Sequence, residues 1–189
     1  MGYYRKMIGA KCYLSPASLD DAVQWTAWLN DLEVALPLGD EAFTLISPET
    51  QQALIAESPR RNDHIFAIID SHGDQPIGRC LLFGVDPINR SAMAGIFIGA
   101  KSDWNQGYGF EAMQLLLDYG FNLLNLNSVM LGVYSFNQGA LRCYQKLGFK
   151  EIGRRRQARI VGNRKYDCTF MDILAEEFES VYVGKLLER

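Results

Sequence analysis

The chain has few of the residues on which zinc sites, disulfide bonds and histidine-based catalysis depend. Its 189 residues include two histidines, His64 and His72, and four cysteines that form no CxxC pair. Structural zinc sites need such ligands in closely spaced sets, and a catalytic triad needs a histidine beside its nucleophile. We therefore expect reduced thiols, no metal site and no catalytic histidine.

The sequence also lacks a long apolar run and a surplus of positive charge. No stretch approaches the roughly 18 to 20 apolar residues of a membrane helix, and the N-terminal residues contain no signal-peptide core or cleavage site. The formal net charge is -3, whereas a protein that binds a nucleic-acid backbone normally carries a basic face. These absences predict a cytoplasmic protein that binds neither membranes nor nucleic acid, and they leave a homo-oligomer open.

No feature divides the chain into parts. Internal repeats, low-complexity tracts and Pro/Gly-rich linkers are absent, and 48% of the residues are hydrophobic. One domain usually holds about 100 to 200 residues. We expect a single domain over residues 1–189, with its core over residues 8–178.

Hydrophobic periodicity predicts strands mixed with helices. The spacing of Leu19, Val23 and Leu29 predicts the buried face of a first helix that begins after Ser18. A second helix is expected over 48–57, opened by a serine and a proline. Apolar runs separated by turn-forming residues predict the other elements. These are a short strand 11–14, an antiparallel meander 64–70, 77–85 and 93–99, a helix from 110, a strand 129–136, a helix 140–147 and a closing hairpin whose last strand is 166–174.

The most informative string runs from Asp103 to Ala112, between an apolar strand and an amphipathic helix. Gly107 and Gly109 let the backbone approach a ligand, and the following helix directs its unpaired N–H groups and positive dipole end toward the same space. The string is not a Walker loop, which would continue with Gly-Lys-Ser/Thr, and Ala112 replaces the third glycine of a dinucleotide fingerprint. It predicts an anion site, with an ordinary tight turn as the alternative.

A second informative string runs from Phe136 to Phe149. Asn137 ends a strand and begins a helix, so its side chain can cap that helix or face a ligand. Tyr144 lies on the apolar face of the same helix. From periodicity alone, a core aromatic is the better interpretation of Tyr144.

Together the two strings resemble those of the GCN5-related N-acetyltransferases, within them the branch of ribosomal-protein alanine acetyltransferases and spermidine acetyltransferases. The resemblance covers residues 8–178 and is strongest over 95–149. It implies an α+β fold in which a twisted, mostly antiparallel central sheet is flanked by helices and split by a V-shaped slot for acyl-CoA. It also implies acetyl-CoA as cosubstrate and acetyl transfer to an amine.

The resemblance further implies a role for each candidate site residue. Backbone N–H groups of the loop Gln106-Gly107-Tyr108-Gly109-Phe110 would bind the CoA pyrophosphate. The strand Phe97-Ile98-Gly99 would splay from the next strand and hold the pantetheine arm. Tyr144 would protonate the departing thiolate, the N–H near Ile98 would polarise the thioester carbonyl, and Asn137 would hold pantetheine or an ordered water.

Two positions depart from the family pattern. Trp104 stands where relatives usually carry Arg or Gln, so we expect backbone dipoles to hold most of the pyrophosphate. Met93 stands where many relatives place a glutamate that deprotonates the amine through water. Carboxylates in the loop expected to face the acceptor are candidates for that task and for attracting a cationic amine. They are Glu33, Asp40 and Glu41. Alternatively, these carboxylates are simply solvated and the amine arrives neutral.

Three functions remain open from the sequence. The first is acetylation of a small-molecule amine such as a polyamine, the second is acetylation of the N-terminal amine of a ribosomal protein, and the third is a non-catalytic acyl-CoA-binding module. Met93 is the argument for the third. A basic stretch near the end of the chain either contacts an acidic acceptor or forms an exposed strand face. It comprises Arg154, Arg155, Arg156 and Arg159.

Overall fold

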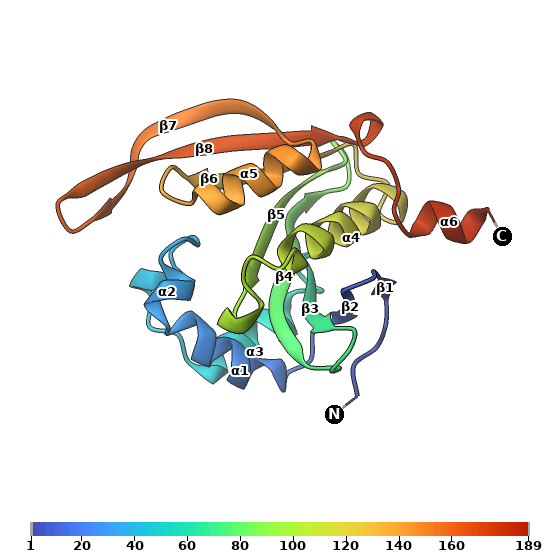
Figure 1. Cartoon of the computed structure of the whole chain (residues 1–189), viewed down its shortest axis with the longest axis horizontal. Coiled ribbons are helices and arrows are strands. Elements are labelled where there is room, and N and C mark those ends of the chain that lie inside the picture. Colours follow the sequence, from blue (N-terminus) through green and yellow to red (C-terminus); the bar gives the residue numbers. More distant parts are fainter. Residues whose placement is uncertain (1, 189) are drawn as a thin grey trace.

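The computed structural model describes residues 2–188 as one eight-stranded sheet with helices on both faces (Figure 1). Met1 and Arg189, the ends of the predicted domain, lie outside this range. The strand order is β1-β2-β3-β4-β5-β6-β8-β7, and only β5 and β6 are parallel neighbours. The strands are β1 (Met7–Ile8), β2 (Cys12–Pro16), β3 (His64–Asp70), β4 (Pro76–Asp86), β5 (Ser91–Ile98), β6 (Ser128–Tyr134), β7 (Lys150–Val161) and β8 (Arg164–Leu174).

Helices connect the strands in the described part of the chain. They are α1 (Asp21–Leu29), α2 (Leu32–Ala35), η1 (Glu41–Phe43), α3 (Pro48–Glu57), η2 (Lys101–Asp103), α4 (Tyr108–Asn122), α5 (Gln138–Leu147), η3 (Ala175–Glu177) and α6 (Val183–Leu187). The predicted start of α3 is confirmed, because Ser47 and Thr50 form a reciprocal capping box ahead of the helix. Gly148 ends α5 in a left-handed conformation, with φ of +100°.

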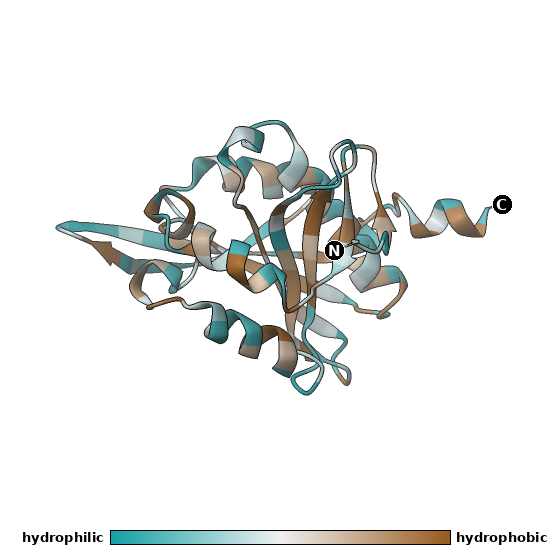
Figure 2. Cartoon of the chain, turned by 90° about the horizontal axis from the view of Figure 1, so that it is seen from below, coloured by the Kyte–Doolittle hydropathy of each residue, from teal (hydrophilic) through white to brown (hydrophobic). Residues whose placement is uncertain are grey.

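Successive side chains of each strand point to opposite faces of the sheet and belong to two separate core layers. On β3, Phe66 and Ile68 belong to the layer covered by α4, whereas Ile65 and Ile69 belong to the layer covered by α1 and α3. Figure 2 shows the apolar strands enclosed between these helices. The broad apolar stripe predicted for α4 is buried against the sheet, so the N-terminus of this helix is held firmly beside the end of β5.

The buried face of α1 agrees with the prediction at Leu29, which is 2% exposed, and differs from it elsewhere. Trp25 is fully buried, whereas Leu19 and Val23 are 49% and 64% exposed. The helix begins at Asp21 and not directly after Ser18. Burial of a large indole stabilises the fold more than burial of one aliphatic side chain. Trp25 therefore determines which face of the helix packs against the sheet.

The C-terminal segment after β8 is tied to α4 by the buried carboxylate of Asp118. This carboxylate accepts hydrogen bonds from the N–H groups of Val181, Tyr182 and Val183, at 3.0, 2.6 and 3.1 Å, and from the hydroxyl of Ser180 at 2.8 Å. Charge-assisted hydrogen bonds of this kind are stronger than neutral ones. The segment therefore docks at one defined place on α4.

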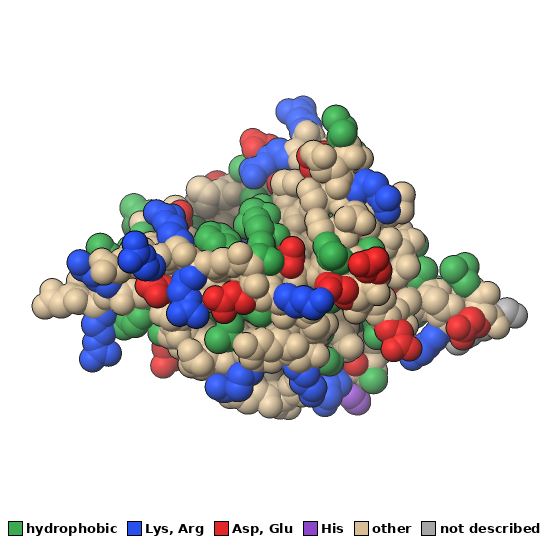
Figure 3. All heavy atoms as spheres, turned by 90° about the horizontal axis from the view of Figure 1, so that it is seen from above, with side chains coloured by type: hydrophobic (Ala, Val, Ile, Leu, Met, Phe, Trp, Pro, Cys, Tyr) green, Lys and Arg blue, Asp and Glu red, His purple; other side chains and the backbone are tan. Residues whose placement is uncertain are grey.

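The hairpin of β7 and β8 extends beyond the helices (Figure 1). Three of its arginines, Arg154 to Arg156, are exposed, as one interpretation of the sequence expected, and basic side chains gather at this narrow end of the molecule (Figure 3). Arg159 is the exception, since it is only 6% exposed. A bulge between Arg155 and Arg159 changes the strand alternation and accompanies the inward turn of Arg159.

Candidate active site

Strands β5 and β6 pair with each other only at their N-terminal ends. The paired residues are Ser91, Ala92 and Met93 of β5 with Ser128, Val129 and Met130 of β6. Beyond them, β5 continues to Ile98 beside β4, and β6 continues to Tyr134 beside β8. The two facing edges thus separate and leave backbone N–H and C=O groups that do not pair across the gap. This is the V-shaped opening that the resemblance implied.

The two faces of β5 border different sides of the opening. Ile96 and Ile98 lie on the side of α4 and α5 and are half-buried. Phe97 faces α1, where its ring meets that of Trp28 edge to face with centroids 6.3 Å apart. Gly99 lies beneath the same indole, because a Cβ at Gly99 would come within 2.1 Å of Trp28. Trp28 thus covers β5 on the side of α1, whereas Ile96 and Ile98 stay partly exposed on the side of α4 and α5.

Helix α4 begins without a side-chain cap. Its N-cap residue, Gly107, has a φ of +88°, a conformation that favours glycine. The backbone N–H of Glu111 donates the first intrahelical hydrogen bond, to the carbonyl oxygen of Gly107 at 3.1 Å. The N–H groups of Tyr108, Gly109 and Phe110 come before this bond and have no partner within the helix. These groups lie at the positive end of the helix dipole and are a candidate anion site, and the binding of an anion here stays a prediction.

Trp104 fastens this loop to β5. Its indole N–H donates to the carbonyl oxygen of Ile98 at 2.8 Å, and the side-chain amide of Gln106 donates to the carbonyl oxygen of Ser102. A Cβ on Gly109 would lie 3.8 Å from Ile98, so the helix start also approaches the strand. Because an indole has a single donor, Trp104 uses it within the protein and has none left for a phosphate.

The turn between β1 and β2 lies against the first turn of α4. The carboxylate of Glu111 accepts hydrogen bonds from the N–H groups of Ala10, Lys11 and Cys12, at 2.9, 2.7 and 2.8 Å. A Cβ on Gly9 would come within 2.6 Å of that carboxyl group, so glycine permits the close approach. One acidic residue of α4 therefore fixes the turn beside the anion site.

Tyr108 is held in place by Asp70 at the end of β3. Its hydroxyl donates to Oδ1 of Asp70 at 2.9 Å. This hydrogen bond and, secondarily, burial raise the pKa of Tyr108 to about 12. The ring of Tyr108 therefore stays neutral at physiological pH and adds no negative charge beside the anion site.

Tyr144 and Asn137 lie at opposite ends of α5. Burial raises the pKa of Tyr144 well above its usual value, and its ring centroid is 5.8 Å from that of Phe149. Asn137 caps the helix, because its Oδ1 accepts from the N–H of Ala140 at 3.1 Å, while its amide N–H groups point elsewhere. The ammonium of Lys146, 4.8 Å from the ring centroid of Phe110, places the last turn of α5 beside the start of α4.

Glu33, a predicted acceptor residue, shares a lysine with Asp31 at the start of α2. Nζ of Lys101 lies 2.6 Å from Oδ2 of Asp31 and also contacts Oε2 of Glu33. The hydrogen bond from Lys101 holds the pKa of Asp31 below its usual value, and the bonds to both carboxylates raise the pKa of Lys101. Since Lys101 follows β5 closely, this ion-pair group joins α2 to the open end of that strand.

Asp40 and Glu41, the other two predicted acceptor residues, each face an arginine of the sheet. Asp40 is 3.7 Å from Arg159 and its side chain is 93% exposed, whereas Glu41 is 4.0 Å from the buried Arg79. Burial lowers the pKa of Arg79 to about 10, and the charge of Glu41 opposes that shift. Glu41 thus faces a buried guanidinium, whereas the carboxylate of Asp40 stays largely exposed to solvent.

Met93 occupies the closed end of the opening. It lies between Phe83 of β4 and Met130 of β6 in the strand register and is half-buried. A thioether is at most a weak hydrogen-bond acceptor, so it cannot take a proton from an amine. The position at which relatives carry a base is apolar here.

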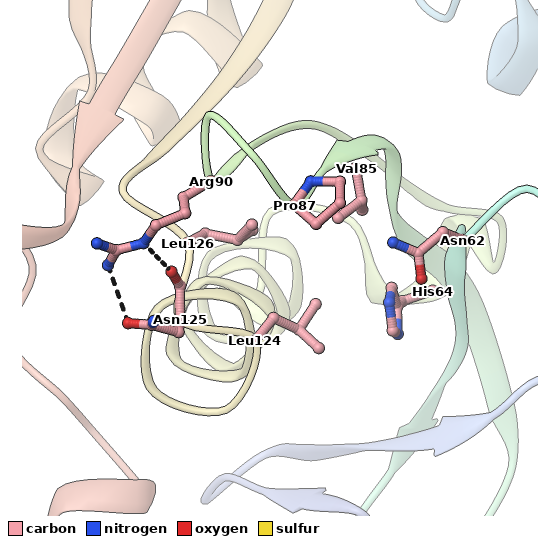
Figure 4. Close-up of a pocket in the computed structure, with 8 residues that line it drawn as sticks. All are labelled: Asn62, His64, Val85, Pro87, Arg90, Leu124, Asn125 and Leu126. Atoms are coloured by element: carbon pink, nitrogen blue, oxygen red, sulfur yellow. Dashed lines mark hydrogen bonds between the residues drawn. The ribbon is translucent and has the colours of Figure 1, made fainter.

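A separate cavity of about 250 Å³ lies at the far end of α4, and no predicted site residue lines it (Figure 4). Its walls come from Asn62, His64, Val85, Pro87, Arg90, Leu124, Asn125 and Leu126. Arg90 donates to the backbone and side-chain oxygens of Asn125, at 2.7 and 2.9 Å. Burial lowers the pKa of His64, which is 3.0 Å from the hydroxyl of Tyr119. These groups are occupied with one another and belong to the packing of the fold.

Residues 2–188 contain no cluster of three or more potential metal ligands. Within the same range, no helix is long and apolar enough to cross a membrane.

The separated strands and the uncapped glycine turn can be compared with those of known proteins. A family model described as an acetyltransferase (GNAT) domain matches residues 11–150. This chain belongs to the GNAT acetyltransferase family. It is therefore an acyltransferase, and the acetyl donor of GNAT enzymes is acetyl-CoA.

Individual relatives agree with this assignment. The uncharacterized N-acetyltransferase p20 of Bacillus licheniformis is 29% identical over 167 residues, which cover 87% of this chain and 93% of the relative. The probable N-acetyltransferase YjcK of Bacillus subtilis is 32% identical over 77% of this chain and 83% of its own length. A spermidine N-acetyltransferase from Vibrio cholerae, solved with CoA and spermine, has a TM-score of 0.79 at 24% identity, over 89% of this chain and 98% of that one. At that identity, the likeness shows the fold.

Two residues near this site make contacts that the sequence did not predict. Arg159, which the sequence grouped with three other arginines, is buried and holds the loop that carries Asp40. Lys11 projects beside Gly107, although the two residues are far apart in the chain. They lie close together because the N–H of Lys11 donates to the carboxylate of Glu111, in the first turn of the helix that Gly107 begins.

Proposed function

We propose that this GNAT protein transfers the acetyl group of acetyl-CoA directly to a primary amine of a small molecule, with a polyamine as the favoured acceptor and Tyr144 as general acid. The observation that carries the proposal is the gap between β5 and β6, which ends beside the uncapped start of α4. A diphosphate and an extended amide-containing chain have matching partners at these two places.

Different residues of the chain would bind different parts of the acetyl donor. The N–H groups at positions 108 to 110 would bind the diphosphate, and the unpaired edge of β5 near Ile98 would hydrogen-bond the amides of the pantetheine arm. The amide of Asn137, whose oxygen caps α5, has N–H groups left to hold that arm or a water. When bound, the donor supplies a thioester whose carbonyl carbon accepts the amine nitrogen and whose thiolate then departs.

We assign the protonation of that thiolate to Tyr144, as the family resemblance implies. Its phenol holds the proton at the working pH, and burial raises its pKa further, which makes it a weaker acid. Tyr144 is partly buried and packs against the core layer covered by α4, so a structural core aromatic is the alternative to the catalytic role.

A polyamine is favoured as acceptor by two facts. The spermidine N(1)-acetyltransferase of Vibrio cholerae is 33% identical to this chain over 104 residues. In addition, Glu33 and Asp40 keep exposed side chains beside α2 and η1, where they would attract a cationic amine. Because Met93 provides no base, the amine loses its proton to one of these carboxylates, to Glu41 or to solvent before it attacks.

A second candidate acceptor is the N-terminal amine of a ribosomal protein. The putative ribosomal N-acetyltransferase YdaF of Bacillus subtilis is 29% identical to this chain over 102 residues, which cover 54% of the chain. The exposed arginines of the β7–β8 hairpin would contact such a larger substrate. A non-catalytic acyl-CoA-binding module, argued from Met93, is the third candidate.

Thiol release from acetyl-CoA separates the three candidates. The purified protein is incubated with acetyl-CoA and a panel of triamines, tetraamines, monoamines and peptides with free N-termini, and acetylated products are identified by mass spectrometry. The proposal requires turnover that is fastest with polyamines. Turnover only with peptides supports the second candidate, and CoA binding without turnover across the whole panel supports the third.

Replacement of Tyr144 by phenylalanine tests the mechanism. A lost general acid typically lowers kcat by about 10² to 10⁴-fold, whereas CoA affinity in calorimetry should stay unchanged because the ring remains. Tyr4→Phe is the matched control, since Tyr4 is 76% exposed and far from the site. Full activity of Tyr144→Phe would show that another group protonates the thiolate.

A further inference from the structure

One face of the sheet stays uncovered beside the opening between β5 and β6. In the strand register, Met93 of β5 lies between Phe83 of β4 and Met130 of β6. Phe170 of β8 is the register partner of Gly132, the next residue of β6 on the same face. The four apolar side chains are partly exposed and belong to neither core layer. We call the surface formed by Phe83, Met93, Met130 and Phe170 the apolar floor.

Glycines at both edges of the opening let the apolar floor continue up to the gap. Gly95 of β5 and Gly132 of β6 carry no side chain where the two strands begin to separate. A Cβ on Gly95 would lie 3.7 Å from the ring of Phe83, and a Cβ on Gly132 would lie 3.6 Å from the ring of Phe170. The two rings therefore extend toward the opening from opposite sides.

The opposite face of the same strands is closed at this end of the opening. Ala92 and Ala94 of β5 are 5% and 7% exposed, and Val129 and Leu131 of β6 are 0% and 2% exposed. All four belong to the core layer covered by α4. A ligand that reaches the closed end of the opening must therefore lie on the apolar floor.

The sheet separates the apolar floor from the expected donor side. The candidate anion site at the start of α4 and the ring of Tyr144 in α5 both belong to the side that α4 covers. A thioester that enters the opening from that side presents its other side to the apolar floor. An amine that attacks the thioester carbonyl carbon therefore approaches over these apolar side chains.

No charged side chain lies within the apolar floor. Asp172 of β8 is the register partner of Met130, and Lys150 of β7 is the register partner of Asp172. Their opposite charges border the floor on one side. An ammonium group above the centre of the floor would lose hydration without gaining a partner, which favours an uncharged segment at this place.

We propose that the apolar floor binds the uncharged carbon chain next to the reacting nitrogen, and that the protein thereby selects linear aliphatic amines with a long uncharged segment. Methionine side chains are flexible and adapt to chains of different shape. Met93, which provides no base, thus has a role in acceptor binding. In a polyamine, a methylene segment covers the floor while more distant ammonium groups reach the exposed carboxylates of α2 and η1. This inference rests on the proposed function, since it describes the acceptor of the same reaction.

Calorimetric titration of the CoA-loaded protein with primary n-alkylamines tests this role without turnover. From ethylamine to hexylamine, each added methylene group should tighten binding by about two- to fourfold, the larger value corresponding to complete burial. Met130→Gln keeps the approximate size of the side chain and makes it polar, so the gain per methylene should shrink. Ile88→Gln is the matched control, because Ile88 is 88% exposed in the turn before β5, and it should keep the wild-type gain.

Met93→Glu separates a role in acceptor binding from a general structural defect. A carboxylate at this position should weaken the binding of hexylamine and leave that of ethylamine equal or stronger, whereas a structural defect would weaken both alike. Unfolding midpoints establish that each variant is folded. If Met130→Gln is unfolded, Met93→Gln takes its place in the length series.

Other occupants of the apolar floor predict different results. If a second copy of this chain covers the floor, sedimentation shows a dimer that Met130→Gln weakens, and alkylamine affinity does not depend on length. If the acyl chain of the donor covers it, hexanoyl-CoA binds more tightly than acetyl-CoA in wild type but not in Met130→Gln. Either result, or an equal gain per methylene in wild type and Met130→Gln, refutes the proposed role of the floor. Failure of the wild-type protein to bind CoA or to acetylate any amine refutes the proposed function instead.

Discussion

Arg159 of β7 donates a hydrogen bond from Nη2 to the hydroxyl of Tyr134 at the end of β6, over 2.6 Å. The same nitrogen contacts the carbonyl oxygens of Leu38 and Gly39. Its guanidinium carbon also lies 4.7 Å from the ring centroid of Phe43. One buried side chain thereby joins the distal hairpin, one edge of the opening and the loop that carries the predicted acceptor residues.

Arg159→Lys should therefore disturb the acceptor side and leave the donor side intact. A lysine ammonium cannot reproduce the forked contacts of a guanidinium, so the free energy of unfolding should fall by about 1 to 3 kcal/mol. The KM for the amine should rise while CoA affinity in calorimetry stays the same. Urea unfolding and steady-state kinetics measure these effects. Arg155→Lys, at an exposed position of the same strand, is the control and should change neither.

The behaviour of Arg159 illustrates where prediction from the sequence ends. Strict alternation along β7 would place Arg155 and Arg159 on the same face, and only the bulge between them and the distant loop at Leu38 and Gly39 separate Arg159 from Arg155. The face of α1 was mispredicted for a similar reason. Leu19 and Val23 form a credible apolar stripe, but the cavity that accepts Trp25 is built by strands far away in the chain.

Features that depend on local sequence were predicted well. The serine and proline that open α3 and the end of α5 at Leu147 follow from neighbouring residues, because helix caps are short-range effects. The parting of β5 from β6 came from family resemblance, since no residue pattern in either strand specifies where pairing stops. The ion pairs of Glu33 and Glu41 join distant segments and had no local signal.

Gly107→Val should weaken CoA binding more than it destabilises the fold. A side chain in the left-handed region costs about 1 to 2 kcal/mol, and a β-branched group would also cover the N–H groups at the start of α4. Calorimetry with CoA and urea unfolding separate the two effects. Gly139→Ala, in the first turn of α5 with open space around its Cβ position, is the control. Undiminished CoA affinity in Gly107→Val would refute the assignment of the loop.

Asp70 should make stability sensitive to acid. Burial alone would raise its pKa, but hydrogen bonds from the N–H of Gly73 and the hydroxyl of Tyr108 outweigh burial and lower it. A carboxylate whose pKa is depressed on folding stabilises the native state above its unfolded pKa of about 3.9, and this contribution is lost as the pH falls further. The difference in unfolding free energy between wild type and Asp70→Asn should therefore shrink below that pH. Urea titrations across the acid range measure it, and a constant difference would show that Asp70 acts only through packing.

Lys101→Met tests whether the carboxylates at the start of α2 take part in acceptor binding. The wild-type lysine neutralises Asp31 and Glu33, so its removal should leave both free to attract a polyamine. Exposed ion pairs are worth up to about 1 kcal/mol, which corresponds to a KM lower by about fivefold or less at low salt, and added salt should abolish the gain. Lys150→Met is a matched control, because Lys150 makes an equivalent exposed pair with Glu177 but lies away from α2. If the KM for a polyamine is the same in wild type and Lys101→Met at low salt, Glu33 does not contact the acceptor. Asp40 and Glu41 are then the remaining carboxylates that could attract it.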